Sequence, residues 1–489
     1  MDIEFVDQTL RDGQQSLWGL RMRAYHAAEA LPHIDQTGFR VVDLTGAGMF
    51  TVLVREFSDD PWESTDFLVK NLPNSTIRAG QRTTAVIGFQ QAPDSIIDLW
   101  VQTLIKHGVR SHWIYDCLYD MPTMQRLAKV IHDAGGVAVP AIMYGLTGVH
   151  DDAFFAARAQ EMASWEGVET VYVEDAAGVL TPERAATLLP AIRAATGSMP
   201  LELHCHNTTG LAQLNYIEGI KAGFTILHTA SRPLANGGMS LPSTEGMMPI
   251  LADMGHTHGL DTSRFAPVEE NFIWAAADAG FEPGRPVEYD PRVYRHQIPG
   301  GMMGTLRNQL AMHGMGERLP EALAEIPRVR EELAHPIMAT PFSQFVGIQA
   351  VLNIITGNRY ELVPDEVIHY ALGHYGPLMR PLDPDVKDKI LGTDRAKKLV
   401  DWVRPQPTLA EIRKNFPIGI SDEELLLRFM LSDEEVDAVK AAGPIRTDPR
   451  RSTNTIVREV VDLLAEQRQA TSLSVSRPGF AMTLRRSNR

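Results

Sequence analysis

Short apolar segments alternate with longer segments of helical periodicity over roughly the first 260 residues. This alternation is typical of repeated βα units, in which buried parallel strands are joined by helices. We predict eight strands: Ile3–Asp7, Val41–Leu44, Thr76–Gln81, Ser111–Tyr115, Ala138–Met143, Thr170–Val173, Leu201–His204 and Thr225–His228. Helical periodicity lies between them, at Ala24–Thr37, Ser95–His107, Met121–Ala134 and Thr181–Thr196. Eight such units predict an α/β fold that closes as a (β/α)8 TIM barrel.

The pattern changes twice after the predicted barrel, which we assign to residues 1–262. Residues 263–443 show helices separated by Pro- and Gly-containing turns and no clear strand, which predicts a mostly helical C-terminal domain packed on the barrel mouth. Residues 444–489 form a basic tail with nine arginines against four acidic residues from Ile445 onward. We expect one amphipathic helix there, around Thr455–Gln467, and a polar finish that is a mobile tail, an oligomer contact or a docking arm.

Composition narrows the class of protein. The 489 residues are 44% hydrophobic and 22% charged, as in ordinary soluble globular proteins. A net charge of −15 argues against general nucleic-acid affinity. Only two cysteines occur, Cys117 and Cys205, which fits a reducing compartment. The first residues lack the features of a secretory leader and no apolar run is long enough to span a membrane, so we expect a cytoplasmic protein with no membrane partner.

Two histidines at a predicted strand end are the strongest chemical signal. His204 and His206 follow the strand-like run Met199–Leu203. Side chains two positions apart on a strand point the same way, so both imidazoles face one point and can share a metal ion. Buried histidines that only satisfy hydrogen bonds are the alternative. The spacing favours a ligand pair.

A second polar cluster follows the first predicted strand. Asp12 is a candidate metal ligand at the C-terminal mouth, where barrel enzymes place their sites, although a loop carboxylate or helix cap fits the same pattern. Arg11 either holds a carboxylate substrate or pairs with a neighbouring acid. Gln15 either presents its amide to a substrate oxygen or is a polar loop residue.

Other strand ends add further candidates. Glu174 and Asp175 close the sixth predicted strand, and a carboxylate there would complete a site of two imidazoles and two oxygens, suited to zinc or manganese. An exposed salt bridge is the alternative. Arg82, after the third strand, is a second possible anion clamp. Thr340-Pro341 lies in the helical region and is unremarkable by itself.

Several segments together resemble a known family. They are Asp7-x-Thr9-Leu10-Arg11-Asp12-Gly13-x-Gln15-Ser16, the loop 82–89, Glu174 to Leu180, His204-x-His206, Ile298-Pro299-Gly300-Gly301, Ala339-Thr340-Pro341-x-Ser343 and Pro407 to Ile412. This set, in this order and over about residues 1–440, resembles the carboxyltransferase domain of pyruvate carboxylase and the related subunits of oxaloacetate decarboxylase and transcarboxylase. The first motif is also similar to the wider group of metal-dependent barrel lyases.

The resemblance implies roles for individual residues. Asp12, His204 and His206 match the family's metal ligands. The residues that match those holding the 2-oxo acid and its enolate are Arg11, Gln15 and Arg82. Thr340 matches the threonine that carries the proton between substrate and carboxybiotin. The resemblance also implies a homodimer.

The chain departs from the family where biotin chemistry is concerned. Glu174 replaces a carbamylated lysine that bridges to the metal, and it would supply a similar anionic oxygen directly. Met302 and Gln344 replace a glutamine and a lysine of the biotin pocket, and Phe89 replaces a substrate-loop tyrosine. No Met-Lys-Met signature of a biotinyl domain occurs, so we expect no biotin covalently bound to this chain.

Three functional hypotheses follow. The first is an enzyme that makes or breaks a C–C bond next to a carbonyl through a metal-stabilised enolate of a 2-oxo acid such as pyruvate or oxaloacetate, with metal ligands Asp12, Glu174, His204 and His206 and without biotin. The second is a biotin-dependent carboxyltransferase subunit whose carrier lies on a separate chain. The third is a non-catalytic scaffold subunit of a carboxylase-like complex. The retained metal, arginine and threonine motifs favour an enzyme over a scaffold, and Glu174, Met302 and Gln344 count against the second hypothesis, so we favour the first.

Overall fold

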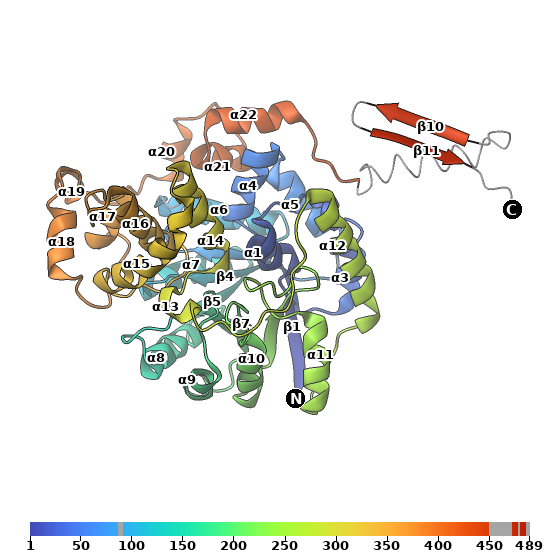
Figure 1. Cartoon of the computed structure of the whole chain (residues 1–489), viewed down its shortest axis with the longest axis horizontal. Helices are drawn as coiled ribbons and strands as arrows, with labels where there is room; N and C mark the ends of the chain where they lie inside the picture. Colours follow the sequence, from blue (N-terminus) through green and yellow to red (C-terminus); the bar gives the residue numbers. More distant parts are fainter. Residues whose placement is uncertain (87–90, 449–471, 478–479, 486–489) are drawn as a thin grey trace.

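Eight parallel strands form a closed barrel in the computed structural model, which describes residues 1–86, 91–448, 472–477 and 480–485 (Figure 1). The barrel strands are β1 (Asp2–Asp7), β2 (Val41–Gly46), β3 (Ile77–Arg82), β4 (Ser111–Tyr115), β5 (Val137–Met143), β6 (Val171–Asp175), β7 (Leu201–Cys205) and β8 (Ile226–Thr229). Each strand pairs with its neighbours in sequence, and β1 pairs with both β2 and β8. The predicted TIM barrel is therefore confirmed, with strand ends that differ from the predictions by at most two residues.

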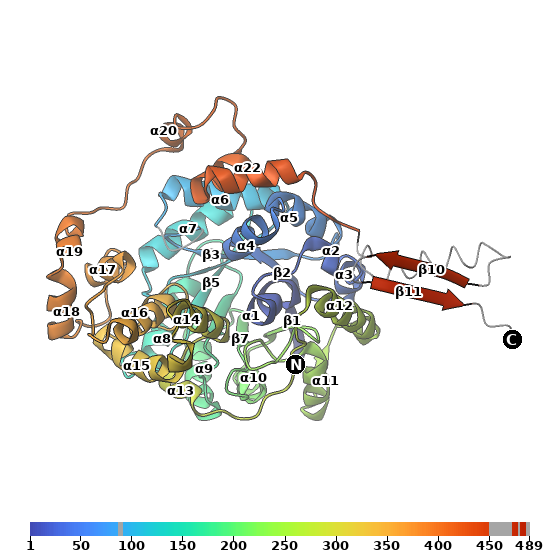
Figure 2. The ribbon, with the colours of Figure 1, turned by 45° about the horizontal axis from the view of Figure 1, so that its top comes forward.

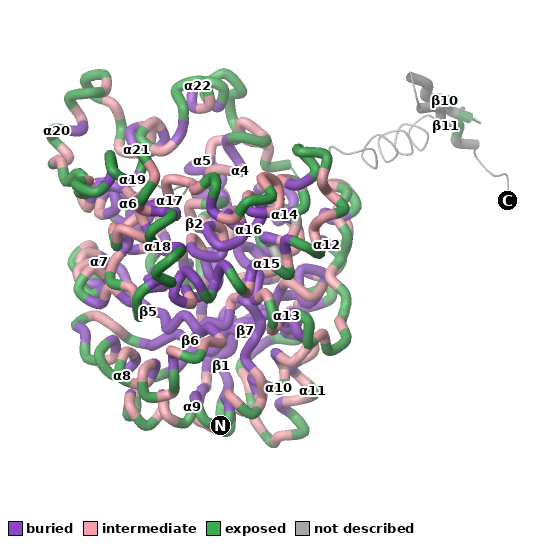
Figure 3. The backbone as a smooth tube through the Cα atoms, turned by 60° about the vertical axis from the view of Figure 1, so that its left-hand side comes forward, coloured by how far each residue is buried: buried purple, intermediate pink, exposed green. Residues whose placement is uncertain are grey.

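The central strands owe their position to burial on both faces. Every residue of β6 and β7 is buried, as expected for parallel strands with side chains inside the barrel and helices outside. Figure 3 shows this buried backbone at the middle of the molecule, inside a largely exposed rim. A short additional strand, β9 (Thr257–His258), pairs with the start of β1.

Helices surround the barrel on the outside. Those of the first 262 residues are α1 (Gln14–Trp18), α2 (Ala24–Ala27), α3 (Leu31–Thr37), α4 (Ala47–Phe57), α5 (Pro61–Lys70), α6 (Asp94–Lys106), α7 (Met121–Asp133), α8 (Asp152–Ala163), α9 (Pro182–Thr196), α10 (Ala212–Lys221) and α11 (Thr244–Asp253), with the π-helical turn η1 (Thr9–Gly13) before α1. The continuous helix predicted over Ala24–Thr37 is wrong, because α2 ends at Ala27 and α3 begins at Leu31. Pro32 lies in the first turn of α3, the helical position at which a missing N–H is tolerated.

The following region is helical, as predicted, up to residue 442. It contains η2 (Thr262–Arg264), α12 (Phe265–Ala279), α13 (Val293–His296), α14 (Gly300–Met312), η3 (Gly316–Arg318), α15 (Leu319–Glu332), α16 (Phe342–Thr356), α17 (Asp365–Ala371), α18 (Pro384–Leu391), α19 (Asp394–Leu399), α20 (Leu409–Arg413), α21 (Asp422–Met430) and α22 (Asp433–Ala442). In Figure 2, α13 to α16 lie together beside the barrel, whereas α22 lies along α4 to α6.

Three hydrogen bonds show how the helical region reaches the barrel mouth. Gln297 and Arg330 both donate to the carbonyl oxygen of Leu146, in the loop after β5, at 2.9 Å. Gln91, before α6, donates to the carbonyl oxygen of His374 at 2.7 Å. The helical region therefore covers the end of the barrel at which the strands carry their predicted chemical groups.

The C-terminal segment differs from its prediction. The helix expected around Thr455–Gln467 lies outside the described residues. The polar finish predicted for the tail instead contains two strands, β10 (Ser472–Arg477) and β11 (Phe480–Arg485), which pair as an antiparallel two-stranded sheet. Its alternating polar and apolar residues follow the period-two pattern of a hairpin, which the basic composition of the tail obscured. Among the described helices, none has both the length and the apolar character needed to cross a lipid bilayer.

Candidate metal centre and substrate pocket

Three predicted ligands meet at the C-terminal ends of β1 and β7. Asp12 lies in η1, directly after β1, while His204 lies within β7 and His206 follows that strand. One ligand atom of each residue lies within 4.8 Å of the others, and all three side chains are buried. The closed barrel thus brings residues from distant parts of the chain to one point.

Asp12 is the centre of this cluster. Its Oδ2 atom lies 3.0 Å from Nε2 of His204 and 3.0 Å from Nε2 of His206. Burial alone would raise the pKa of Asp12, but the charge of Arg11 and the contacts with both histidines hold that pKa well below its usual range. Ser16 fixes the other oxygen, Oδ1, by donating a hydrogen bond of 2.9 Å. The carboxylate is therefore ionised and held in place.

The two imidazoles are arranged to offer lone pairs. Nδ1 of His206 lies 2.7 Å from the carbonyl oxygen of Met239, which can only accept, so Nδ1 carries the proton and Nε2 has the lone pair in the neutral ring. Nε2 of His204 is buried and makes no hydrogen bond with any described residue, despite its closeness to Asp12. Two imidazole nitrogens and one carboxylate oxygen converge on one point, where Nε2 of His206 hydrogen-bonds with Oδ2 of Asp12 at 3.0 Å. This donor set fits a divalent metal ion such as zinc or manganese.

Glu174 lies beside the cluster rather than within it. It is the residue of β6 paired in register with His204 of β7, so the two side chains project from neighbouring positions of the sheet. Its ligand atoms are not among those that lie within 4.8 Å of one another. Glu174 is buried, its Oε2 has no hydrogen-bond partner among the described residues, and burial raises its pKa to about 7. One oxygen of this acidic group is thus unpaired next to the three converging ligands.

Both carboxylate oxygens of Asp175, the other acidic residue at this strand end, already accept hydrogen bonds from the backbone. Its Oδ1 accepts from the backbone amide of Val179 at 3.0 Å, and its Oδ2 accepts from that of Leu180 at 2.7 Å. Burial raises its pKa to about 6. The carboxylate therefore shapes the loop after β6, which leaves Glu174 as the available acid of the pair.

Arg11 pairs with neighbouring acids, which is one of its two predicted roles. Its Nη1 lies 3.3 Å from Asp12 and its Nε lies 3.4 Å from Asp43 of β2, so it pairs with neighbouring acids. Its Nη2 is buried and has no hydrogen-bond partner among the described residues. The guanidinium packs over the ring of Trp113, 5.2 Å from the ring centroid. Trp113 in turn occupies the space above Gly80, where a Cβ atom would approach the indole to 2.6 Å.

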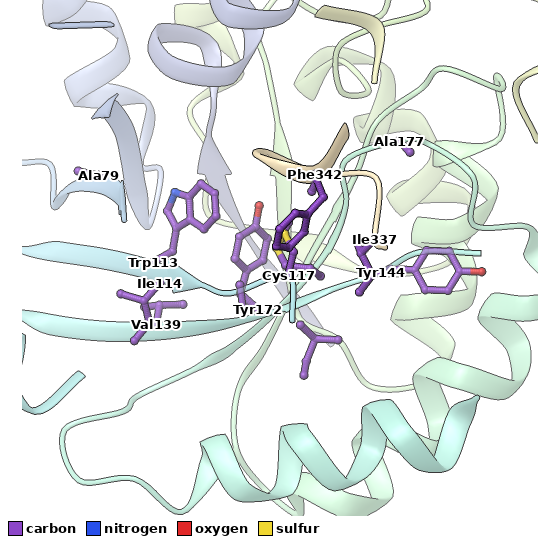
Figure 4. Packing of buried hydrophobic residues seen from close by; sticks show 14 of the residues in the cluster. Ala79, Trp113, Ile114, Cys117, Val139, Tyr144, Tyr172, Ala177, Ile337 and Phe342 are labelled. Carbon is purple, nitrogen blue, oxygen red and sulfur yellow. The ribbon is translucent and has the colours of Figure 1, made fainter. Parts of the chain in front are cut away.

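Arg82 and Thr340 meet at a second point of the mouth. Both line a cavity of about 30 Å³ together with Tyr115, Asp116, Cys117 and Tyr375. Nη2 of Arg82 donates to the carbonyl oxygen of Val86 at 2.7 Å, so one side of the guanidinium is anchored to its own loop. Figure 4 shows Phe342, from the helical region, directly above Cys117, and Ile337 close to Tyr144. The helical region thus forms one wall of this cavity, and it is this region that places Thr340 there.

Tyr115 connects the two points electrostatically. Burial raises the pKa of its hydroxyl, and the charges of Arg82, Glu174 and Arg11 all act on it. Its ring stacks on that of Trp113 at a centroid distance of 4.9 Å, and Trp113 contacts Arg11. The three converging ligands and the Arg82–Thr340 cavity are therefore neighbouring parts of one mouth.

Gln15 is not brought into the site. Its side chain is exposed on α1, whereas the adjacent Gln14 is buried and its amide nitrogen donates to the carbonyl oxygen of Leu10 at 2.9 Å. The positions that depart from the family pattern differ in their surroundings. Met302 is buried in α14, and Gln344 donates from Nε2 to Oγ1 of Thr340 at 3.1 Å. Phe89 lies outside the described residues.

Sequence reasoning missed the residues that support the ligands. Ser16 and Met239 hold Asp12 and His206, and His228 of β8 lies 3.2 Å from His204, Nδ1 to Nδ1. Met239 acts through its backbone, so no side-chain pattern marks it. His228 carried a signal, because it ends a predicted strand as His204 does.

Comparisons with known proteins agree with this architecture. A family described as "Conserved carboxylase domain" matches residues 293–453, and one described as "HMGL-like" matches residues 122–269. A pyruvate carboxylase subunit of Methanocaldococcus jannaschii is 32% identical over 391 residues, which cover 80% of this chain and 68% of that protein. "Methylmalonyl-CoA carboxyltransferase 5S subunit" of Propionibacterium freudenreichii is 29% identical, and the match covers 83% of this chain and 80% of that protein. The solved carboxyl transferase domain of Rhizobium etli pyruvate carboxylase with pyruvate has the same fold, with a TM-score of 0.80, 23% identity, and coverage of 92% of this chain and 78% of that one.

Proposed function

Since this chain belongs to the carboxyltransferase family of pyruvate carboxylase and transcarboxylase subunits, we propose that it transfers a carboxyl group to or from the carbon next to the carbonyl of a small 2-oxo acid, such as pyruvate or oxaloacetate. The observation that carries the proposal is the convergence of Asp12, His204 and His206 beside the partly unpaired guanidinium of Arg11. A scaffold protein has no need of three converging buried ligand atoms.

Asp12, His204 and His206 would hold one divalent ion, zinc or manganese, with Glu174 as the fourth ligand. Such an ion would act as a Lewis acid toward a substrate oxygen. The support for Glu174 is its register with His204 and its buried, unpaired oxygen Oε2. A buried acid with no partner is costly unless a cation compensates its charge.

Arg11 and Arg82 would bind and orient the substrate. When a C–C bond next to a carbonyl breaks or forms, negative charge develops on the carbonyl oxygen. Fixed donors aimed at that oxygen from a water-poor cleft stabilise the transition state by several kcal/mol, on the order seen for oxyanion holes. Nη2 of Arg11 is such a donor, because no described residue occupies it. Arg82 would hold the carboxylate end of the substrate in the adjoining cavity.

Thr340 would deliver or remove the proton at the reacting carbon. It lines the same cavity as Arg82, and its Oγ1 accepts a hydrogen bond from Gln344, which leaves the hydroxyl proton available to the cavity. Gln15 is exposed at the start of α1, so we assign it at most a contact with substrate that enters from solvent.

The carrier of the carboxyl group would be biotin on a separate chain, because the two relatives named above are themselves described as subunits. A second candidate function is decarboxylation without biotin. It is favoured by the pairing of Gln344 with Thr340 and by Met302, since both residues stand in the biotin pocket of the family. We also propose a homodimer on the basis of the family resemblance.

One experiment separates these functions. The purified chain is assayed for oxaloacetate decarboxylation alone, with free biotin, and with a biotinylated carrier protein with or without avidin. The carboxyltransferase proposal expects carrier-dependent turnover that avidin abolishes. Turnover by the chain alone that avidin does not change supports the biotin-independent function. No turnover of oxaloacetate under any of these conditions contradicts both.

A further inference from the structure

A row of buried polar side chains crosses the barrel interior next to the three converging ligands Asp12, His204 and His206. Its members lie on four strands and directly after β1, and they are almost completely inaccessible to solvent: Gln8, Asp43, Arg78, Glu202, His204 and His228. The proposed function uses only His204. Oε1 of Gln8 and Oδ1 of Asp43 have no hydrogen-bond partner among the described residues. For the remaining contacts, the donor and acceptor chemistry of each group gives the direction of the bond.

The row begins with an ion pair. Nη2 of Arg78 donates to Oε1 of Glu202 at 3.0 Å, and Nη1 donates to Oε2 at 2.5 Å. Thr170 donates a further hydrogen bond of 2.7 Å to Oε1. A carboxylate in this bidentate pair offers only acceptor atoms to its remaining neighbour.

That neighbour is His228, and its protonation is determined from both sides. Nε2 of His228 lies 2.8 Å from Oε2 of Glu202, so Nε2 must donate. The amide nitrogen of Gln8 lies 3.1 Å from Oδ2 of Asp43 and 3.0 Å from Nδ1 of His228. Because an amide nitrogen only donates, Nδ1 of His228 accepts. Both contacts require the neutral ring with its proton on Nε2.

His204 is the last member of the row. Its Nδ1 lies 3.2 Å from Nδ1 of His228, whose single lone pair also faces the amide of Gln8. His204 can share this acceptor only with its own proton on Nδ1. Its Nε2 then has the lone pair. This atom lies 3.0 Å from the ionised Oδ2 of Asp12, so a proton on Nε2 that donates to Asp12 is the competing tautomer, against which the contact with His228 acts.

We propose that Glu202, anchored by Arg78, fixes through His228 the tautomer of His204 that leaves Nε2 free to bind a divalent cation. Glu202 and His228 are thus positioning residues for a metal ligand they support from behind. The inference rests on the proposed function for the identity of the bound group, but the tautomer itself is a property of the metal-free chain. Arg78 and Glu202 would otherwise be only a buried ion pair that joins β3 to β7.

The tautomer is measured directly on the full-length, metal-free protein. Labelling with 15N-histidine and long-range 1H–15N correlation distinguishes a proton on Nδ1 from one on Nε2, and the signals of His204 are assigned by their loss in His204→Gln. We expect a proton on Nδ1 in the wild type and a mixture of both tautomers in Glu202→Gln. Glu332→Gln is the matched control, because Glu332 is also a buried acid paired with an arginine, Arg359, but in the helical region. A wild-type His204 with its proton on Nε2, or a tautomer that Glu202→Gln does not alter, would overturn the proposal.

Zinc affinity, measured by competition with a chromophoric chelator, gives the second readout. We expect Glu202→Gln and His228→Leu to bind Zn²⁺ about 10- to 100-fold more weakly than the wild type, as losses of outer-shell partners do. The controls Glu332→Gln and His112→Leu, the latter at another buried histidine, should stay within about twofold of the wild type.

The outcomes separate the two proposals. Unchanged zinc affinity in both Glu202→Gln and His228→Leu would reduce the row to a structural element and overturn the inference. If Glu202→Gln does not fold, His228→Leu breaks the same connection and decides the question. If the wild type binds no zinc but His204 shows the expected tautomer, the proposed function fails while the hydrogen-bond row stands.

Discussion

Glu174 of β6 and His204 of β7 are partners in register across two parallel strands, at the end of the barrel where Asp12 and His206 also lie. His204 joins the cluster of converging ligand atoms, whereas the carboxylate of Glu174 remains beside it with one oxygen unpaired among the described residues. Three ligands are therefore already in place, and we propose that a bound cation would bring in Glu174 as the fourth.

Substitution of Glu174 by glutamine tests its proposed role as the fourth ligand. The amide keeps the shape but loses the charge that would compensate the cation, so we expect metal affinity to fall by about 10-fold or more while the fold is kept. Glu169→Gln, at an exposed acid just before β6, is the matched control. Equal zinc or manganese affinity in Glu174→Gln and the control would show that Glu174 is no ligand.

Arg82 is expected to act mainly in substrate binding. Arg82→Lys keeps the charge but removes the planar pair of donors that matches a carboxylate, so the KM for a 2-oxo acid should rise by about 10-fold with a smaller change in kcat. Steady-state kinetics of wild type, Arg82→Lys and the exposed control Arg110→Lys measure this. An unchanged KM in Arg82→Lys argues against a role in holding the substrate.

Thr340 is expected to act in proton transfer. Thr340→Ala should lower kcat on the order of 10²-fold, because positioned proton donors and acceptors contribute at least that much. Thr340→Ser should recover most of the activity, since it keeps the hydroxyl. Thr356→Ala, which removes a hydroxyl at the end of α16, is the control. Loss of activity in Thr340→Ser equal to that in Thr340→Ala would point to packing instead of proton transfer.

His112 is expected to make the fold sensitive to mild acid. Burial lowers its pKa from the usual 6.5 to about 4 in the folded protein, so the unfolded chain binds the proton more readily. Above pH 6.5 His112 is neutral in both the folded and the unfolded chain, and the fold keeps its full stability. As the pH falls from 6.5 toward 4, the unfolded chain takes up the proton and the free energy of unfolding falls. Between pH 7.5 and pH 5 we expect the free energy of unfolding to drop by about 2 kcal/mol more in the wild type than in His112→Gln.

Urea unfolding at the two pH values measures this difference. His33→Gln, at a histidine on α3 that is only partly buried, serves as the control. An equal drop in the wild type and in His112→Gln would mean that His112 does not carry the effect.

The barrel and its ligand cluster were largely predictable from the sequence. Strands buried on both faces appear in the sequence as uninterrupted apolar runs. His204 and His206 are two positions apart, which predicts that their side chains point to the same side. The break between α2 and α3 was missed because helical periodicity continues across it. The hairpin of β10 and β11 was missed because the basic composition of the tail was given more weight than its alternation of polar and apolar residues.

The surroundings of the ligands were not predictable in the same way. Exposure separates Gln14 from Gln15, adjacent residues of the same type, and only the packed structure decides which of them is buried. Met239 supports His206 through a backbone carbonyl, which any residue type provides. Contacts between distant segments, such as Cys117 with the carbonyl oxygen of Thr340 at 3.7 Å, depend on the fold as a whole.

Metal content is the measurement that tests the central claim most directly. Wild type and Asp12→Asn are stripped with a chelator, reloaded with zinc or manganese, desalted and analysed by elemental mass spectrometry, with folding checked by circular dichroism. Asp12 is the acidic centre of the cluster, so we predict about one tightly bound ion per chain in the wild type and almost none in the folded Asp12→Asn protein. A wild type that retains no ion, or an Asp12→Asn variant that retains as much as the wild type, would contradict the account.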